Sequence, residues 1–114
     1  MNWTKLEHLK DDQPLFRGTL FRYRRPTPRE EILDYMLLET HEESGFGLVR
    51  DCGYGAGHVL VILPAEAKAQ GKIVAISSDW LRRNWQKWVD SNSAADHIWV
   101  CLQGRPAPDK LPDE

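Results

Sequence analysis

"RDCGYGAGHVLVIL" (residues 50–63) decides the fold, because its alternating glycines fit either a phosphate-binding loop or the tip of a β-hairpin. A phosphate-binding loop runs from a strand into a helix whose N-terminus faces the phosphates. Here the glycines precede a β-branched run typical of a strand, and the spacing Gly53-x-Gly55-x-Gly57 matches neither nucleotide-binding fingerprint. We therefore predict a hairpin turn with an exposed Tyr54 instead of a nucleotide site.

The residues before this hairpin predict further strands. "LFRGTLFRYRR" (15–25) alternates apolar and polar residues as a half-buried strand does, with its arginines on the wet face. "YMLLETHEESGFGLVRD" (35–51) reads as two strands joined by a turn at Glu43-Ser44-Gly45. Between them, "RPTPREE" has a helix-start pattern, so residues 28–40 are compatible with helix or strand, and we favour a strand from about Tyr35.

Three apolar segments after the glycines predict buried strands. The first is expected to be a central strand with both sides covered, because it is apolar on both faces and rich in β-branched residues, and the other two share this character. These segments are "HVLVILP" (58–64), "KIVAI" (72–76) and "HIWVCL" (97–102).

"SSDWLRRNWQKWVD" (77–90) predicts the main helix. Ser77 is a good N-cap, and Leu81, Trp85 and Trp88 recur at the spacing of a core-facing stripe. The polar positions Arg82, Arg83, Gln86 and Lys87 are expected to face water. We predict an α+β fold, a mainly antiparallel sheet with this tryptophan-rich helix packed on one face.

Length and composition indicate one small domain. The chain has 114 residues, of which 41% are hydrophobic and 28% charged. We expect a domain over residues 1–104 and a disordered, proline-rich tail over 105–114. The N-terminus lacks the pattern of a secretion signal, no apolar run is long enough to span a bilayer, and two cysteines are too few for a disulfide scaffold. These features predict a cytoplasmic protein with reduced thiols.

The sequence offers few candidate catalytic or metal-binding residues. Cys52 and His58 flank the glycine turn and form a possible nucleophile–base dyad, but no third group orients the histidine. His41 and Asp51 extend this pair to a metal-ligand set without a recognisable spacing. We favour ordinary strand-end residues, and expect no catalytic residue, metal or cofactor.

The formal net charge of −2 hides two opposite blocks. Residues 17–29 carry five arginines and no acid, whereas residues 30–51 carry seven acids and one base. The arginine strand, together with five tryptophans, allows an alternative function as a small nucleic-acid-binding module. The acidic block is either a solvated edge or a docking surface for a basic partner.

Three stretches together resemble the bacterial immunity proteins of polymorphic toxin systems, small cytoplasmic partners encoded beside a toxin gene. They are "SGFGLVRDCGYGAGHVLVILP" (44–64), "GKIVAISSDWLRRNWQKWV" (71–89) and "DHIWVCL" (96–102). The resemblance covers roughly residues 16–103 and rests on the order of strands and on the spacing of tryptophans in the helix. It implies a stoichiometric inhibitor that binds a cognate toxin domain and occludes its active site, with no catalytic residue to carry over.

The expected toxin contacts follow from charge. Many such toxins are nucleases, and a nuclease needs a basic groove to hold phosphates, so an acidic surface could occupy that groove. The residues expected to bind the toxin are Glu39, Glu42, Glu43, Asp51 and Tyr54. Neither a membrane nor a small-molecule ligand is expected as a partner.

Overall fold

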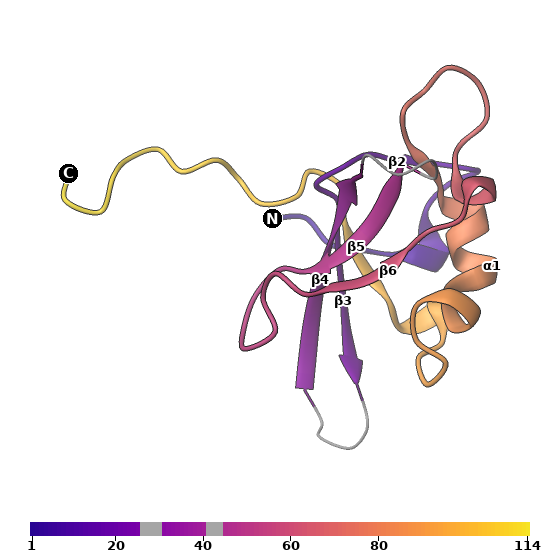
Figure 1. Cartoon of the computed structure of the whole chain (residues 1–114), viewed down its shortest axis with the longest axis horizontal. Coiled ribbons are helices and arrows are strands. Elements are labelled where there is room, and N and C mark those ends of the chain that lie inside the picture. The colour runs from indigo at the N-terminus through magenta and orange to yellow at the C-terminus, as the bar shows by residue number, and fades with distance from the viewer. Residues whose placement is uncertain (26–30, 41–44) are drawn as a thin grey trace.

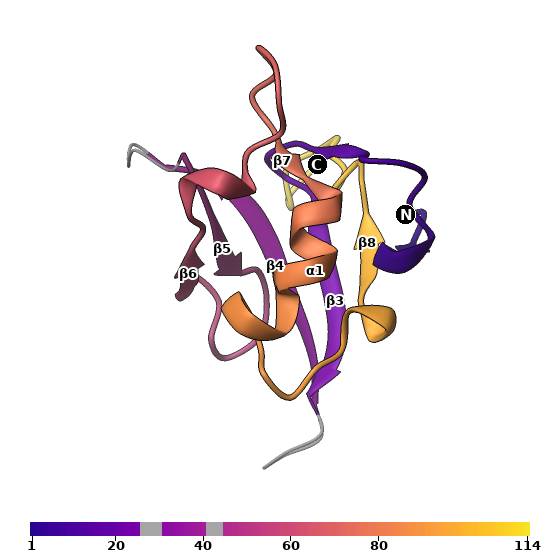
Figure 2. The ribbon, with the colours of Figure 1, turned by 90° about the vertical axis from the view of Figure 1, so that its right-hand side faces the viewer.

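The computed structural model describes residues 1–25, 31–40 and 45–114, and it confirms the α+β class. Six antiparallel strands form one sheet in the order β1-β8-β3-β4-β5-β6, and β2 and β7 form a two-stranded sheet. Helix α1 lies across one face of the large sheet, in front of β3 and β4 in Figure 2. The strands are β1 Thr4–Lys5, β2 Pro14–Leu15, β3 Leu20–Arg25, β4 Glu31–Glu39, β5 Phe46–Arg50, β6 Val59–Ile62, β7 Ile76–Ser77 and β8 Trp99–Cys101. The helices are η1 Leu6–His8, η2 Ala65–Ala67, α1 Ser78–Trp88 and η3 Ala95–His97.

Helix α1 begins at the predicted cap. The Ser77 hydroxyl accepts a hydrogen bond from the Trp80 backbone N–H at 3.0 Å, which satisfies one of the unpaired donors of the first turn. The same hydroxyl donates to Asp12 Oδ1 at 2.7 Å, and the Asp79 N–H donates to that oxygen at 3.1 Å. These two hydrogen bonds hold the pKa of Asp12 below its usual range.

The core is built on Trp85. Its ring is fully buried and meets the rings of Phe21 at 5.9 Å and Tyr23 at 5.6 Å between centroids. Leu81 is also fully buried and Trp88 packs at the rim of the core, so the predicted helical stripe is confirmed. Burial raises the pKa of Tyr23 far above its ordinary value, and its protonated hydroxyl donates to Asp90 Oδ2 at 2.9 Å.

None of the described residues forms a long helix on the opposite side of the large sheet, and we call this side the open face. Since Phe21 and Tyr23 point toward α1, the residues that alternate with them, Arg22 and Arg24, project from this open face. Register places Asp34 and Ile32 of β4 and Trp99 of β8 on the same side. The terminal segment 105–114 leaves the body on the side away from α1 (Figure 1).

The glycine-rich stretch forms the predicted hairpin. Strands β5 and β6 are antiparallel neighbours, and the Arg50 N–H donates to the His58 carbonyl at 2.8 Å across the turn. Gly53 and Gly57 have φ values of 76° and 91°, a conformation that favours glycine, and Tyr54 is fully exposed. The glycines therefore shape a turn, as expected.

Within the ambiguous segment 28–40, the described residues Glu31–Glu39 form strand β4, which starts earlier than the expected Tyr35. The helix-start pattern at 27–30 lies outside the described residues, as do Glu43 and Ser44 of the expected turn. At the described border of that turn, the Thr40 N–H donates to the Gly45 carbonyl at 2.9 Å.

Two of the predicted buried strands were wrong. Strand β6 is an edge strand with Val59 and Ile62 exposed, because the chain turns away after Leu63 and no described strand lies beyond it. In "KIVAI", only Ile76 joins a strand. Residues 69–75 form a projecting loop, closed by an Ala69 N–H to Ala75 carbonyl bond of 2.9 Å (Figure 1).

Two side chains also differ from expectation. Trp99, expected in a buried strand, is 42% exposed because it faces the open side of β8. Arg82, expected to face water, donates to the carbonyls of Leu6 and Asp11, both at 2.9 Å, and pairs with Asp79. Arg82 therefore ties the N-terminal segment to α1.

Candidate partner-binding surface

A partly buried ion pair lies on the open face. Arg22 and Asp34 stand directly opposite each other in the β3–β4 register, and both nitrogens of the guanidinium fork donate to the carboxylate at 2.7 Å. The Asp34 side chain is only 3% exposed, and the Arg22 guanidinium also stacks over the Trp3 ring at 4.2 Å. The hydrogen bond with Asp34 raises the pKa of Arg22.

Arg105 extends this pair into a network. Its Nη2 lies 3.2 Å from Asp34 Oδ2, and its Nε donates to Asp51 Oδ2 at 2.6 Å. The hydrogen bond to Asp51 raises the pKa of Arg105. The network fixes the start of the 105–114 segment to the open face and largely neutralises Asp34 and Asp51.

A cleft of about 660 Å³ opens beside this network, between β3 and the segment that precedes β8. It exists because β8 begins at Trp99, opposite Arg22, whereas β3 continues to Arg25. The chain before Trp99 forms η3 instead of pairing with β3, and leaves a hollow. We call this hollow the β3–β8 cleft.

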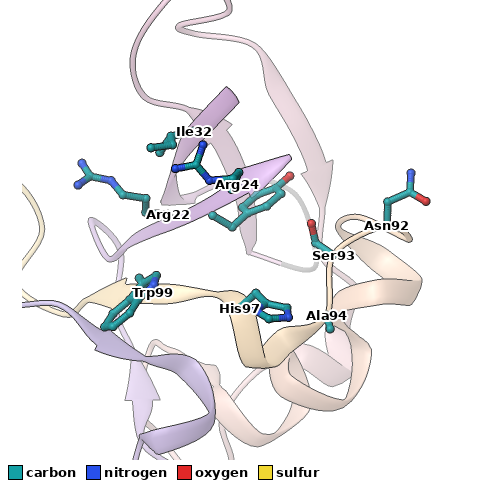
Figure 3. Close-up of a pocket in the computed structure, with 9 residues that line it drawn as sticks. Arg22, Arg24, Ile32, Asn92, Ser93, Ala94, His97 and Trp99 are labelled. Atoms are coloured by element: carbon teal, nitrogen blue, oxygen red, sulfur yellow. The ribbon is translucent and has the colours of Figure 1, made fainter. Parts of the chain in front are cut away.

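The walls of the cleft combine apolar and polar groups, as ligand sites do. Trp99 and Ile32 are 42% and 53% exposed, and Arg24 is exposed between them on β3. Figure 3 shows Asn92, Ser93, Ala94 and His97 on the wall opposite β3. Ser93 is 6% exposed, and its Oγ has no hydrogen-bond partner among the residues that the structure describes.

Comparison with protein families gives a match to the model described as Immunity protein 45, over residues 10–100. The chain belongs to this immunity-protein family. The family assignment confirms the resemblance drawn from the sequence. Searches of curated proteins and of solved structures give no match.

The residues expected to bind the toxin are dispersed in this immunity protein. Glu39 pairs with Phe46 at one end of β5, whereas Asp51 follows the other end, so roughly 15 Å of strand separates them. Glu39 lies 3.9 Å from Arg17, Asp51 is held by Arg105, and Tyr54 is exposed on the neighbouring turn. Glu42 and Glu43 lie outside the described residues.

The other candidate sites gain no support from the geometry. Cys52 is half-buried and His58 is exposed, and no hydrogen bond joins these two described side chains. Within residues 1–25, 31–40 and 45–114, no group of three His, Cys, Asp or Glu side chains could hold a metal ion. None of the helices in the described parts of the chain is long and apolar enough to cross a membrane.

Sequence reasoning missed the partners of the open face. Arg22 and Asp34 belong to opposite charge blocks, and Asp34 precedes the strand expected from about Tyr35, so the pairing across β3 and β4 could not be predicted from the sequence. Arg105 and Ser93 gave no sequence signal, because their importance depends on contacts made by segments far apart in the chain.

Proposed function

We propose that this protein neutralises a cognate toxin domain by binding it one-to-one and covering its active site, in the cytoplasm of the cell that encodes both. The family supports an immunity function. The observation that carries the binding mode is the open face, where α1 covers one side of the sheet and leaves exposed apolar side chains around an ordered charge network on the other. Such a rigid, mixed surface suits protein binding without catalysis.

The arrangement favours a protein partner over a nucleic acid. Three arginines of the basic segment face carboxylates: Arg22 pairs with Asp34, Arg25 lies 3.8 Å from Glu31, and Arg17 lies 3.9 Å from Glu39. Nucleic-acid binding depends on basic groups that replace the counterions of phosphates. Arginines that are already paired with carboxylates are poorly suited to replace the counterions of phosphates.

The residues predicted from the sequence to contact the toxin are also part of the proposed interface. Tyr54 is fully exposed at the tip of the β5–β6 hairpin, where an aromatic ring can anchor an interface. Glu42 and Glu43 would contribute by steering association with a basic nuclease groove, because rim charges act mainly on the association rate. Glu39 and Asp51 would contribute less, since they already face Arg17 and Arg105. Tyr54 is thus expected to affect dissociation, and the acids association.

The direct test uses the toxin domain encoded beside this gene. Co-expression should protect cells, and the purified pair should elute as a one-to-one complex in which the toxin is inactive. Tyr54→Ala should shorten the lifetime of that complex, whereas Val74→Ala, which truncates an exposed side chain in the 69–75 loop, should not. A toxin that remains active in a saturated complex, or no complex at all, would refute neutralisation by occlusion.

A further inference from the structure

We propose that the free edge of β6 pairs with a β-strand of the cognate toxin domain, which extends the six-stranded sheet by one strand. This inference rests on the proposed function and deepens it, because it names main-chain hydrogen bonds as the means by which the toxin is held.

The first observation is that β6 directs backbone groups away from the sheet. Two hydrogen bonds to β5 fix their orientation: the His58 carbonyl accepts one at 2.8 Å, and the Leu63 N–H donates one at 2.9 Å. In a trans peptide the carbonyl and the N–H of the next residue point in opposite directions. The Val59 N–H and the Ile62 carbonyl therefore point away from β5, and no strand in the described part of the chain pairs with them there.

The second observation is the spacing of these outward groups. Val59 is paired with Val49 of β5. Ile62 is paired with Gly47, only two residues before Val49, because the register shifts at Leu48 and adds one residue to β6. The outward groups are thus about 7 Å apart along the edge, the repeat of alternate residues in a regular strand. A regular strand can pair with this edge despite the bulge.

The third observation is the apolar side chains at the edge. Val59 is 45% exposed and Ile62 is 40% exposed. Their partners on β5 flank Leu48, which is fully buried in the core, so Val59 and Ile62 lie on the open face. A Cβ at Gly47 would come within 3.0 Å of Ile62 Cδ1, which shows that the Ile62 side chain lies over the sheet. Apolar side chains of an added strand would pack beside these two residues.

The two edges of the sheet are built differently. The opposite edge is β1, which is only two residues long and carries Lys5. Short edges and lysines both discourage the addition of a strand. Strand β6 has four apolar residues in succession and neither lysine nor proline. Because native proteins usually protect an edge of this kind, we assign the β6 edge to a partner.

The length of the edge favours a toxin strand over a second copy of this chain. Two β6 strands related by symmetry would pair along only four residues each, roughly 14 Å, whereas a stable interface buries about 800 Å² on each partner. A toxin strand is free of this symmetry and can continue past Val59. The chain before Val59 is the turn that carries Tyr54, so the added strand would lie beside the toxin contact proposed above.

The first test places a lysine on the edge and uses the toxin domain encoded beside the gene. Val59→Lys and Ile62→Lys should each weaken toxin binding about tenfold or more, because a charged side chain on an edge opposes strand pairing. The controls are Ile73→Lys and Val74→Lys in the projecting loop, where both side chains are at least half exposed. Both controls should bind as wild type does. Circular dichroism and urea unfolding show which variants remain folded.

The second test separates main-chain pairing from side-chain contact. Val59→Pro removes the outward N–H at the first residue of an edge strand, a position that accepts proline, whereas Val59→Ala keeps this N–H. The proline variant should bind about fivefold more weakly than the alanine variant. Lys5→Pro is the control on the opposite edge, where the φ of −66° already suits proline, and should bind as wild type does.

Hydrogen exchange reports the same main-chain bond without a substitution. The Val59 amide should exchange more slowly in the toxin complex than in the free protein, whereas the Ile73 amide in the projecting loop should keep its rate. Unchanged exchange at Val59, together with equal binding by Val59→Pro and Val59→Ala, would show that no strand is added at this edge.

The outcomes separate this inference from the proposed function. If wild type binds the toxin one-to-one and both lysine variants bind equally well, the pairing is overturned and the proposed function stands. If wild type forms no complex with that toxin, the proposed function fails, and this inference fails with it. If the protein alone is a dimer that Val59→Lys dissociates, the edge binds a second copy and the assignment to the toxin is wrong.

Discussion

Arg105 and Asp34 are 71 residues apart in the sequence, yet Arg105 Nη2 lies 3.2 Å from Asp34 Oδ2. Arg22, on the neighbouring strand, donates to the same carboxylate, so Asp34 accepts hydrogen bonds from two arginines. Of the three side chains, Asp34 is buried whereas both arginines are about half exposed. If these ion pairs are broken, each half-exposed arginine can still be hydrated, whereas the buried carboxylate cannot.

We expect the two arginines to differ in their effect on stability. Arg22→Gln breaks a bidentate pair with a buried carboxylate and should lower the free energy of unfolding by about 2–4 kcal/mol. Arg105→Gln removes a more exposed contact and should cost about 1 kcal/mol or less. Urea unfolding of both variants, and of each combined with Asp34→Asn, gives the coupling energies. Equal coupling of both arginines to Asp34 would contradict this ranking.

Trp85→Ala should lower the free energy of unfolding by about 3–5 kcal/mol, because the ring is fully buried between α1 and the sheet. Trp99→Ala is the matched control, since it removes the same side chain from an exposed position and should cost much less. Urea midpoints measure both. A midpoint unchanged by Trp85→Ala would mean that the helical stripe does not form the core.

The helix cap should make stability depend on acid pH. The pKa of Asp12 is lowered in the folded state by the hydrogen bonds from Ser77 and Asp79, so its carboxylate stabilises the fold at pH values above the ordinary aspartate pKa of about 3.9. That contribution is lost as the pH falls through the lowered pKa. The difference in unfolding free energy between wild type and Asp12→Asn should thus be constant near neutral pH and shrink below about pH 4. Asp11→Asn, one residue away from the cap contact, serves as the control, and a difference that persists at pH 2 would contradict the assignment.

The acidic segment should act on the rate of toxin association. Glu42→Lys combined with Glu43→Lys should slow association and flatten its dependence on ionic strength, since charges on the rim of an interface are screened beyond about 8 Å at physiological salt. Stopped-flow association rates over a series of salt concentrations test this. Superimposable curves for wild type and the double variant would remove these acids from the interface.

The sequence was most informative where local rules decide the structure. The Ser77 cap, the Leu81–Trp85 stripe and the glycine turn each depend on residues a few positions apart, and all three were predicted correctly. The position of a strand within its sheet depends instead on which strands lie beside it. For this reason the apolar "HVLVILP" was expected at the centre of the sheet, although β6 lies at its edge.

The candidate site was harder to predict than the fold. The β3–β8 cleft arises because β8 begins opposite Arg22 and stops short of the end of β3, a detail of register that composition does not encode. Charge blocks along the chain were a poor guide as well, because Arg22 and Asp34 cancel across neighbouring strands. Tyr54, by contrast, was predicted to be exposed because a glycine-rich turn leaves its side chain nowhere to pack.

The anchoring of both chain ends beside the open face affects how the protein can be labelled. Trp3 lies against Arg22, and Arg105 is bound to Asp34 and Asp51, so the chain enters and leaves on the side of the sheet that faces away from α1 (Figure 1). A bulky affinity tag or fluorescent protein joined at the N-terminus would begin next to this surface and shield it from a toxin, whereas the C-terminus lies away from the body, at the far end of segment 105–114 (Figure 1). The 69–75 loop projects from another part of the molecule, so a fluorophore attached at Gln70 would report binding without crowding the interface.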